Sequence, residues 1–437
     1  MGSGGPGCRK GSLMNIALDK APGGCGCDDQ PGHALLPLAD AISRGLDLAH
    51  RVAEVEMVPL TQAMGRVLAE DAIAPIPLPP FDNSAMDGYL VRLADLDAAG
   101  GRDGPWRLRL RGRIAAGDGG SVRPEAGTAL RILTGAIVPD GFDAVVMQED
   151  CEVADGYIRF SRRPAPGQHV RPAGGDASKG QVVVHAGAEI GPRQAGALAA
   201  IGMAMVPVLR KVRVAIFSTG SELKSPGEPL EAGQIWNSNR FMLLALMKQD
   251  WVDMVDMGAI ADNPDALGKA LREACESCDL VVTTGGVSVG DEDHMPRLFE
   301  EAGGEMSVMK VAIKPGKPIT FGRLNRAIFV GLPGNPVSAF VTWLIIGARM
   351  ARKTAGLADT APVQIPVQSA SDISRKPGRQ EFRPARLSMG KTGPEVTLLD
   401  ASFSGRIALL SEADGLAVIA ADTSRVAKGD RLDFIPF

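Results

Sequence analysis

The chain has 437 residues and a formal net charge of −4, and 45% of its residues are hydrophobic. This length suits about three domains of roughly 150 residues each, and the small negative charge argues against nucleic acid or an anionic membrane as a partner. The longest mostly apolar run, residues 339–348, is much shorter than the roughly 20 residues that cross a bilayer. Six cysteines are too few for a disulfide framework. Composition therefore predicts a soluble protein of the cytoplasm.

The first 33 residues are rich in glycine and show no hydrophobic periodicity, so we expect a disordered tail. This segment contains Cys8, Cys25 and Cys27. The Cys-Gly-Cys triplet could bind a soft metal ion, but no second pair of ligands stands nearby, and incidental thiols are the favoured interpretation. The role of these cysteines stays open at this point.

The segment that follows has apolar residues at helical spacing in two stretches between residues 37 and 71, which predicts a helix in each. The residues that set the spacing are Leu38, Ile42, Leu46, Leu60, Met64 and Val67.

A series of short strands comes next. In residues 106–111 apolar side chains alternate with arginines, which is typical of a strand that is buried on one face. Residues 129–133, 144–147 and 157–160 continue the series. Residues 164–180 are rich in proline, glycine and arginine and are expected to form a loop.

The pattern changes at Val212, where a buried strand begins. Strands and helices then alternate to about residue 360, with helix starts at Asn263-Pro264 and Asn335-Pro336. Such alternation predicts a three-layer α/β domain with a mainly parallel sheet and helices on both faces. The C-x-x-C pair of Cys275 and Cys278 is interpreted as structural. After residue 361 short strands predict a small β-barrel or sandwich.

Three glycine-containing turns follow strands of this α/β domain. A helix that starts after such a turn offers free N–H groups and the positive end of its dipole, which suits oxyanions. Prolines flank the lysines of the second turn and restrict them, although a solvated surface turn is the alternative. The residues concerned are Gly285, Gly286 and Ser288 in the first turn, Lys314 and Lys317 in the second, and Gly334, Asn335 and Ser338 in the third.

Acidic residues stand near the same strand ends, at Glu222, Asp262, Asp291 and Asp293. Each one alone is more often a helix cap or a solvated turn residue. Together with the glycine turns they predict a hard-cation site, and Mg²⁺ is the natural ion because it binds one or two carboxylates plus a substrate phosphate. The metal ligands that we favour are Glu222, Asp262 and Asp293.

Two further segments are ambiguous from composition. Residues 81–89 are dense in turn-forming and hydrogen-bonding residues, and Thr134-Gly135 ends a predicted strand in the same region. Either segment fits a plain loop or a binding loop.

Six segments together carry a resemblance: FDNSAMDGY (81–89), RILTGAIVP (131–139), FSTGSEL (217–223), TTGGVSVGDEDH (283–294), IKPGKP (313–318) and GLPGNPVSAF (331–340). In this order they make residues 34–437 similar to the MoeA family of molybdopterin molybdenumtransferases, to which the C-terminal domain of gephyrin also belongs. The resemblance implies four parts. They are an elongated α+β linker domain (34–71 with 165–211), a β-rich inserted domain (72–164), the α/β molybdopterin-binding domain (212–360) and a C-terminal small β-barrel (361–437).

The resemblance also implies an activity. Adenylylated molybdopterin and molybdate would be substrates, active molybdenum cofactor and AMP would be products, and Mg²⁺ would assist. It implies a homodimer whose cleft joins the α/β domain of one subunit to the β-rich region of the other, and a contact with molybdopterin adenylyltransferase. The positions implied as catalytic are Asp87, Thr134, Asp176, Glu222, Asp262 and Asp293, and those implied for anions are Ser288, Lys314, Lys317 and Ser338.

The chain departs from the family pattern in its acidic lining. Asn237 stands where the family commonly has Asp, Ser221 replaces an acidic or amide residue, and Gly175 replaces a common Glu before Asp176. These changes bear on metal affinity. Two rival functions remain, a molybdopterin adenylyltransferase that consumes ATP and a binding scaffold like gephyrin. Molybdate and tungstate are not separated by the sequence.

Overall fold

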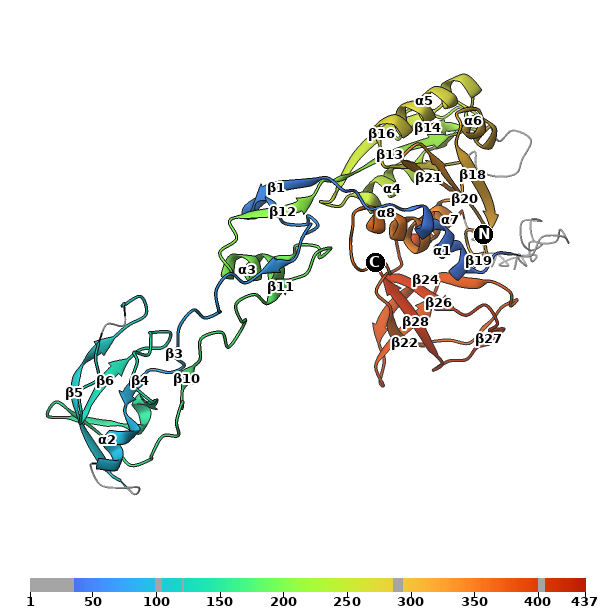
Figure 1. Ribbon diagram of the computed structural model, residues 1–437. Coiled ribbons are helices and arrows are strands. Elements are labelled where there is room, and N and C mark those ends of the chain that lie inside the picture. Colours follow the sequence, from blue (N-terminus) through green and yellow to red (C-terminus); the bar gives the residue numbers. More distant parts are fainter. Residues whose placement is uncertain (1–34, 99–103, 120–121, 286–293, 400–404) are drawn as a thin grey trace, which may run out of the picture.

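The computed structural model describes residues 35–98, 104–119, 122–285, 294–399 and 405–437. The molecule is elongated, with a β-rich body at one end, a narrow linker of two chain segments in the middle, and an α/β body beside a β-barrel at the other end (Figure 1). The predicted fold class, a multidomain protein with α/β and β parts, is confirmed. Within the described ranges, none of the helices has the length and hydrophobicity needed to cross a membrane.

The α/β body is built on a sheet of strand order β16–β13–β17–β21–β20–β18. The first four strands are parallel, and β20 and β18 extend the sheet in antiparallel fashion at one edge. The bounds are β13 (Val212–Thr219), β16 (Val252–Ile260), β17 (Leu280–Thr284), β18 (Glu305–Lys310), β20 (Pro318–Leu324) and β21 (Ala327–Leu332).

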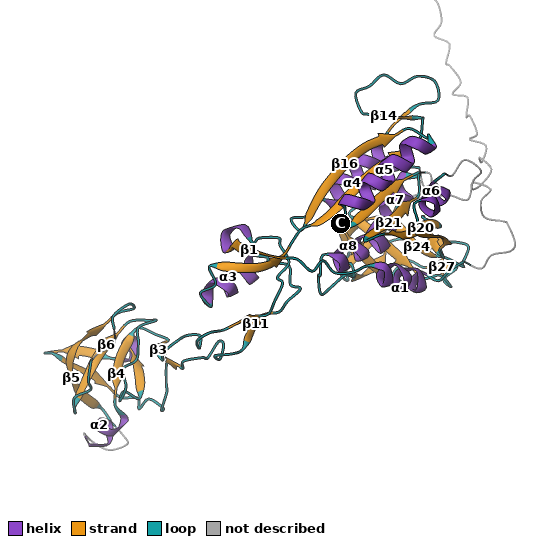
Figure 2. Ribbon diagram, turned by 45° about the horizontal axis from the view of Figure 1, so that its top comes forward, coloured by secondary structure: helices purple, strands orange, loops and turns teal. Residues whose placement is uncertain are grey.

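Helices cover both faces of this sheet, as predicted (Figure 2). Successive side chains of a strand point to opposite faces. Val214 and Ile216 therefore pack into one core, with α1, α4, α7 and α8, whereas Ala215 and Phe217 pack into the other, with α5 and α6. The bounds are α1 (Leu38–Leu48), α4 (Ser238–Met247), α5 (Pro264–Ser277), α6 (Met295–Glu301), α7 (Pro336–Thr342) and α8 (Ala348–Thr354).

The two predicted helix starts differ in their caps. The side chain of Asn263 accepts the N–H groups of Asp265 and Ala266 at 2.9 and 3.2 Å and so caps α5. Helix α7 also begins where predicted, but the side chain of Asn335 makes no capping hydrogen bond. The α-helical hydrogen-bond pattern is interrupted after α7, because Trp343–Gly347 is π-helical between α7 and α8. In this segment the Trp343 ring packs against the bare Cα of Gly347.

Two antiparallel chain segments form the linker. The outgoing strands β1, β2 and β3 pair with the returning strands β12, β11 and β10. The bounds are β1 (Val55–Pro59), β2 (Ala72–Ile73), β3 (Asn83–Ser84), β10 (Val170–Arg171), β11 (Val182–Val184), α3 (Pro192–Ala200) and β12 (Met205–Leu209).

The helix predicted for the second apolar stretch, with Leu60, Met64 and Val67, is wrong. Only the 3₁₀ turn Leu60–Gln62 forms there. The N–H of Leu68 donates to the carbonyl of Ala188, and the carbonyl of Val67 accepts from Leu209. Pairing with the returning segment thus outweighs the local helical pattern.

The β-rich body is a sheet of order β7–β4–β6–β5–β9–β8, with α2 (Leu93–Ala98) beside it. The predicted alternation is confirmed, since Trp106 and Leu108 are buried whereas Arg107 and Arg109 are exposed. The 3₁₀ turn Gln148–Asp150 follows β7. The strand bounds are β4 (Gly88–Val91), β5 (Trp106–Ile114), β6 (Thr128–Ile132), β7 (Ala144–Met147), β8 (Glu152–Ala154) and β9 (Tyr157–Phe160).

The C-terminal region is a closed barrel, which was one of the two predicted alternatives. Its strands follow the order β24–β25–β22–β28–β26, and β26 pairs back with β24. Strand β19 (Ile313–Lys314) of the α/β body pairs in parallel with β24 and attaches the barrel to that body. The other bounds are β22 (Ile365–Ser369), β23 (Ile373–Ser374), β24 (Gln380–Met389), β25 (Pro394–Leu398), α9 (Ile407–Leu410), β26 (Gly415–Ile419), β27 (Arg425–Val426) and β28 (Arg431–Pro436).

One arginine fixes the joint between the linker and the α/β body. Arg210 lies between β12 and β13, and its two terminal nitrogens donate to both carboxylate oxygens of Asp279 at 2.7 and 2.8 Å. Asp279 also accepts the N–H of Arg213 at 2.9 Å, and Glu54 lies 3.2 Å from Nε of Arg210. The hydrogen bond with Asp279 is the main reason why the pKa of Arg210 is raised.

We predict that Asp279→Ala lowers the free energy of unfolding of the α/β body by about 2 kcal/mol, because Arg210 and the N–H of Arg213 lose a charged acceptor. Chemical unfolding measures the change. Asp253→Ala is the matched control, since it removes only the exposed partner of Arg213 at 3.4 Å and should have little effect. Equal effects of the two substitutions would show that the bidentate pair does not fix the joint.

Candidate functional site

The first and third predicted turns begin at the carboxyl ends of parallel strands, the edge where ligands bind in sheets of this kind. Gly285 follows β17 with a φ of +82°, a region that glycine adopts at little cost. A Cβ on Gly285 would lie 2.6 Å from the carbonyl oxygen of Thr219, at the end of β13. A Cβ on Gly334, just after β21, would lie 4.0 Å from the Cα of Gly285. The ends of three adjacent strands therefore pack backbone against backbone.

A buried polar cluster supports this edge. Thr284 Oγ1 donates to Ser218 Oγ at 3.1 Å, and Ser218 Oγ donates to Oδ1 of Asn237 at 3.4 Å. The same Oδ1 accepts the N–H of Arg240 at 3.1 Å and so caps α4. Nδ2 of Asn239 donates to the carbonyl of Gly334 at 2.7 Å. The side chains of Asn237 and Asn239 thus tie α4 to the end of β13 and to the turn after β21.

Two amide atoms of this cluster have no protein partner among the described residues. They are Nδ2 of Asn237 and Oδ1 of Asn239, and both residues are buried. Buried polar groups nearly always have a hydrogen-bond partner. A bound molecule or a water would therefore supply the missing partners of these two atoms. An Asp at 237 would accept the same two bonds. Asn237, in place of the Asp that is common in the family, therefore keeps the helix cap and replaces one acceptor atom with a donor.

Glu222 and Asp262 lie at the same edge. Thr219 of β13 pairs in parallel with Ile260 of β16, and each acidic residue follows one of these two strand ends. The short strand β14 (Leu223–Lys224) continues from Glu222 and pairs with β15 (Ile235–Trp236). Both carboxylates are exposed, and within the described ranges neither side chain has a hydrogen-bond or ion-pair partner. They are therefore available to a cation.

The remaining predicted ligands lie outside the described residues. These are Asp291 and Asp293, together with the anion-binding candidates Gly286 and Ser288. In the parts of the chain that the structure describes, no group of three His, Cys, Asp or Glu side chains could hold a metal ion. A site formed by Glu222, Asp262 and Asp293 thus stays a prediction.

The lysine loop, residues 314–318, packs against α7. A Cβ on Gly316 would collide with Oγ1 of Thr342 and lie 3.4 Å from the carbonyl of Ser338. Lys314 and Lys317 are half-buried, so the loop is not the solvated turn that was the alternative. Nζ of Lys314 lies 3.5 Å from Oε1 of Glu381 in the barrel. Of the third predicted turn, Gly334 and Asn335 are exposed, whereas Ser338 is only 5% exposed.

Asp87 and Thr134 lie together at the far end of the molecule, beside β4 and β6 of the β-rich body (Figure 1). Oδ1 of Asp87 accepts both the N–H and the Oγ1 hydroxyl of Thr134, at 2.7 and 2.6 Å. These two bonds are the main cause of a lowered pKa of Asp87. Asp176 is exposed in the linker, where its N–H donates to the carbonyl of Leu78 at 2.9 Å. One chain therefore does not bring these three residues to the edge that carries Glu222 and Asp262.

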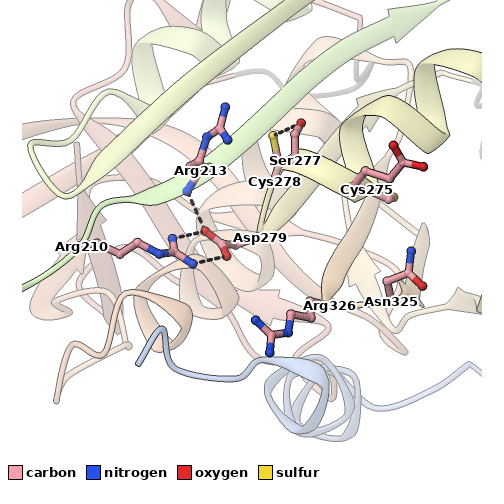
Figure 3. A pocket seen from close by; sticks show the side chains of 9 residues that line it. Arg210, Arg213, Cys275, Ser277, Cys278, Asp279, Asn325 and Arg326 are labelled. Carbon is pink, nitrogen blue, oxygen red and sulfur yellow. Dashed lines mark hydrogen bonds and ion pairs between the residues drawn. The ribbon is translucent and has the colours of Figure 1, made fainter. Parts of the chain in front are cut away.

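A separate cavity of about 480 Å³ lies at the opposite edge of the sheet, beside the joint of Arg210 and Asp279 (Figure 3). Cys275 and Cys278 line it. Burial raises the pKa of Cys275 to about 12 and also raises that of Cys278. Both thiols therefore stay protonated at neutral pH, and unreactive thiols fit the structural interpretation of this pair.

Sequence reasoning did not single out Ser218, Asn239 or Glu381. Ser218 and Asn239 stand inside or beside motifs that were recognised, so their position after a strand and at a helix start was the available signal. Glu381 stands in a barrel strand, and no local pattern connects it with the lysine loop.

We predict that Thr134→Val raises the pKa of Asp87 toward its ordinary value, because one of two hydrogen bonds to the carboxylate is lost while the backbone bond remains. Stability that depends on the Asp87 carboxylate is present above its unfolded-state pKa and is lost as the pH falls through the lowered folded-state value. The substitution should therefore move that loss to higher pH. NMR titration of carbon-13-labelled aspartate measures the shift. Thr128→Val, which removes a hydroxyl bonded to the carbonyl of Glu125, is the control. An unchanged Asp87 titration in Thr134→Val would contradict the assignment.

Comparisons with known proteins cover nearly the whole chain. Family models match the MoeA N-terminal region (domain I and II) at residues 36–202, a probable molybdopterin binding domain at 215–353, and the MoeA C-terminal region (domain IV) at 366–437. A molybdopterin molybdenumtransferase of Haemophilus influenzae is 36% identical over 407 residues, which cover 92% of this chain and 99% of that protein. Molybdopterin molybdenumtransferase 2 of Mycobacterium tuberculosis is 38% identical over 381 residues, or 86% and 93% of the two chains.

Solved structures give the same result. A crystal structure of the molybdopterin biosynthesis moeA protein from Pyrococcus horikoshii has a TM-score of 0.78 and 29% identity, and covers 92% of this chain and 100% of that one. The chain therefore belongs to the family of molybdopterin molybdenumtransferases.

Proposed function

We propose that this chain is the enzyme that inserts molybdenum into molybdopterin, taking adenylylated molybdopterin and molybdate and releasing AMP and active cofactor. The observation that carries the proposal is the carboxyl edge of the α/β sheet. There, two exposed carboxylates that have no partner among the described residues lie beside glycine turns, and a lysine loop packs against the helix that follows β21. This combination suits an anhydride substrate and a tetrahedral oxyanion.

The residues of the edge would act by binding and orientation. Lys314 and Lys317 bring positive charge to the anions, and exposed Gly334 and Asn335 offer donors at the start of α7. Ser338 is buried and would act through the helix start that it belongs to. Two hydroxyls of the edge, those of Ser218 and Thr284, are bonded within the buried cluster. We therefore assign catalysis to positioning and electrostatic stabilisation, without a protein nucleophile.

Mg²⁺ fits the donor set of this edge, because carboxylate oxygens are the ligands it prefers. Glu222 and Asp262, with Asp293, would hold it. When bound, the ion would neutralise charge on the phosphoanhydride of the substrate. The substitution of Asp by Asn237 leaves the ion with fewer carboxylates at this edge.

A homodimer would complete the site. Asp87 and Thr134 lie beside β4 and β6, and Asp176 lies between β10 and β11, elements that Figure 1 shows away from the α/β body. Large apolar side chains are exposed along the linker, where they suit an interface; they are Val55, Met57, Ile73, Ile76 and Met205. In a two-fold dimer, the β-rich body of each subunit would face the α/β edge of the other.

The two rival functions are less well supported. The family matches extend over the regions before and after the molybdopterin-binding domain, whereas an adenylyltransferase would need the α/β body alone. A pure scaffold would have no use for unpaired carboxylates at the strand ends. In the cytoplasm, contact with a molybdopterin adenylyltransferase would deliver the adenylylated substrate.

Anaerobic release of AMP from adenylylated molybdopterin tests the proposal. We predict that release requires molybdate and Mg²⁺, and that Asp262→Asn lowers its rate roughly 100-fold at fixed Mg²⁺, the usual cost of one lost electrostatic partner. Excess Mg²⁺ should restore part of the rate. Asp265→Asn, an exposed neighbour in the first turn of α5, is the control. Release that is independent of molybdate, or that survives Asp262→Asn unchanged, would contradict the assigned function or the assigned metal ligand, respectively.

A further inference from the structure

Glu381 is a buried carboxylate of the barrel that is surrounded by cations. It lies on β24 and is 1% exposed. Its Oε1 accepts from Nε and Nη2 of Arg383, at 3.0 and 2.6 Å, and its Oε2 lies 3.0 Å from Nε of Arg375. The third cation is Lys314, whose Nζ lies 3.5 Å from Oε1. Two of the cations thus come from the barrel, and the third comes from the lysine loop of the α/β body.

The barrel fixes Glu381 without help from Lys314. Arg375 is itself buried, and its terminal nitrogens donate to the carbonyls of Ala420, Thr423 and Arg379. Arg383 stands on the same strand as Glu381. Burial of a carboxylate is tolerated when it is paired with opposite charge, and the two arginines supply that pairing. Arg383 already hydrogen-bonds Oε1, the oxygen nearest to Lys314, whereas Oε2 is only ion-paired with Arg375. The contact with Lys314 is therefore not needed to satisfy the carboxylate.

The same contact has a clear consequence for Lys314. Strand β19 pairs with β24 so that Lys314 is opposite Glu381. The Lys314 side chain is 40% exposed, whereas that of Glu381 is 2% exposed. The ammonium group thus reaches a fixed buried anchor while part of the side chain faces solvent. A lysine that is restricted beforehand loses less rotamer freedom when it binds a ligand.

We propose that Glu381 is a positioning residue that holds the Lys314 ammonium ready for the anionic substrate. This inference rests on the proposed role of the lysine loop. One carboxylate faces three cations, so the junction keeps excess positive charge after pairing. A ligand of the junction would be a small multivalent oxyanion such as molybdate.

In the opposite role, called damping here, Glu381 would only lower the positive potential that Lys314, Arg375 and Arg383 create between the lysine loop and the barrel. The two roles predict opposite signs. Without the carboxylate, a positioned lysine is repelled by Arg375 and Arg383 and binds anions less well. A damped site, in contrast, would bind anions more tightly once the negative charge is gone.

Calorimetric titration of the full-length protein with molybdate alone separates these cases. We expect Glu381→Gln to weaken molybdate binding by roughly tenfold, a usual size for coupling between contacting charged groups. Lys314→Ala should weaken it to a similar extent, and the double variant should bind no worse than Lys314→Ala. Glu412→Gln, which removes an exposed carboxylate paired with Arg386 in the same barrel, should leave binding unchanged.

Glu381→Asp keeps the charge beside the arginines but shortens the reach toward Lys314, so it tests the inference if Glu381→Gln does not fold. We expect weaker binding with an unchanged melting temperature. Tighter or unchanged binding in a folded Glu381 variant, or additive losses in the double variant, would overturn the positioning role alone. Wild-type binding by Lys314→Ala, or no binding by the unchanged protein, would overturn the proposed anion site as well.

Discussion

The antiparallel pairing of two chain segments in the linker sets the arrangement of everything else in this molecule. Strands β1, β2 and β3 pair with β12, β11 and β10, and the Arg210–Asp279 pair fixes the inner end of this linker to the sheet. The β-rich body is therefore held at a distance from the α/β body (Figure 1). Asp87 and Thr134 are bonded to each other but lie far from the sheet edge of their own chain. A second copy of the chain is the simplest partner that could unite the two groups.

The sheet edge has a chemistry that follows from its backbone. Parallel strands end together, and the bare Cα of Gly285 lets the turn after β17 approach the end of β13. Glu222 and Asp262 follow two of these strand ends, and the lysine loop packs against α7, the helix that follows β21. We propose that a bridging cation lets the acidic and basic groups act on one ligand. The barrel joins this arrangement through β19 and Glu381. We therefore propose a site that draws on the sheet edge, the lysine loop and the barrel.

Periodic and local signals were predictable from the sequence. The alternation in residues 106–111, the cap at Asn263 and the strands of the closed barrel are as predicted, because each depends on neighbouring residues. The failures involve distant pairing. The stretch around Met64 has helical spacing, yet it is extended because residues 188 and 209 supply its backbone partners. Glu381 was missed for the same reason, since only the register of β19 with β24 places it beside Lys314.

Mixing two inactive variants tests the shared site most directly. Asp87→Ala and Asp262→Asn chains, carrying different affinity tags, would be coexpressed and the mixed dimers isolated. If each site takes Asp87 from one subunit and Asp262 from the other, one of the two sites in a mixed dimer is intact. The account predicts about half of the wild-type rate of molybdate-dependent AMP release for these dimers. Mixed dimers as inactive as their parents would show that the two residues do not act in one site built from two subunits.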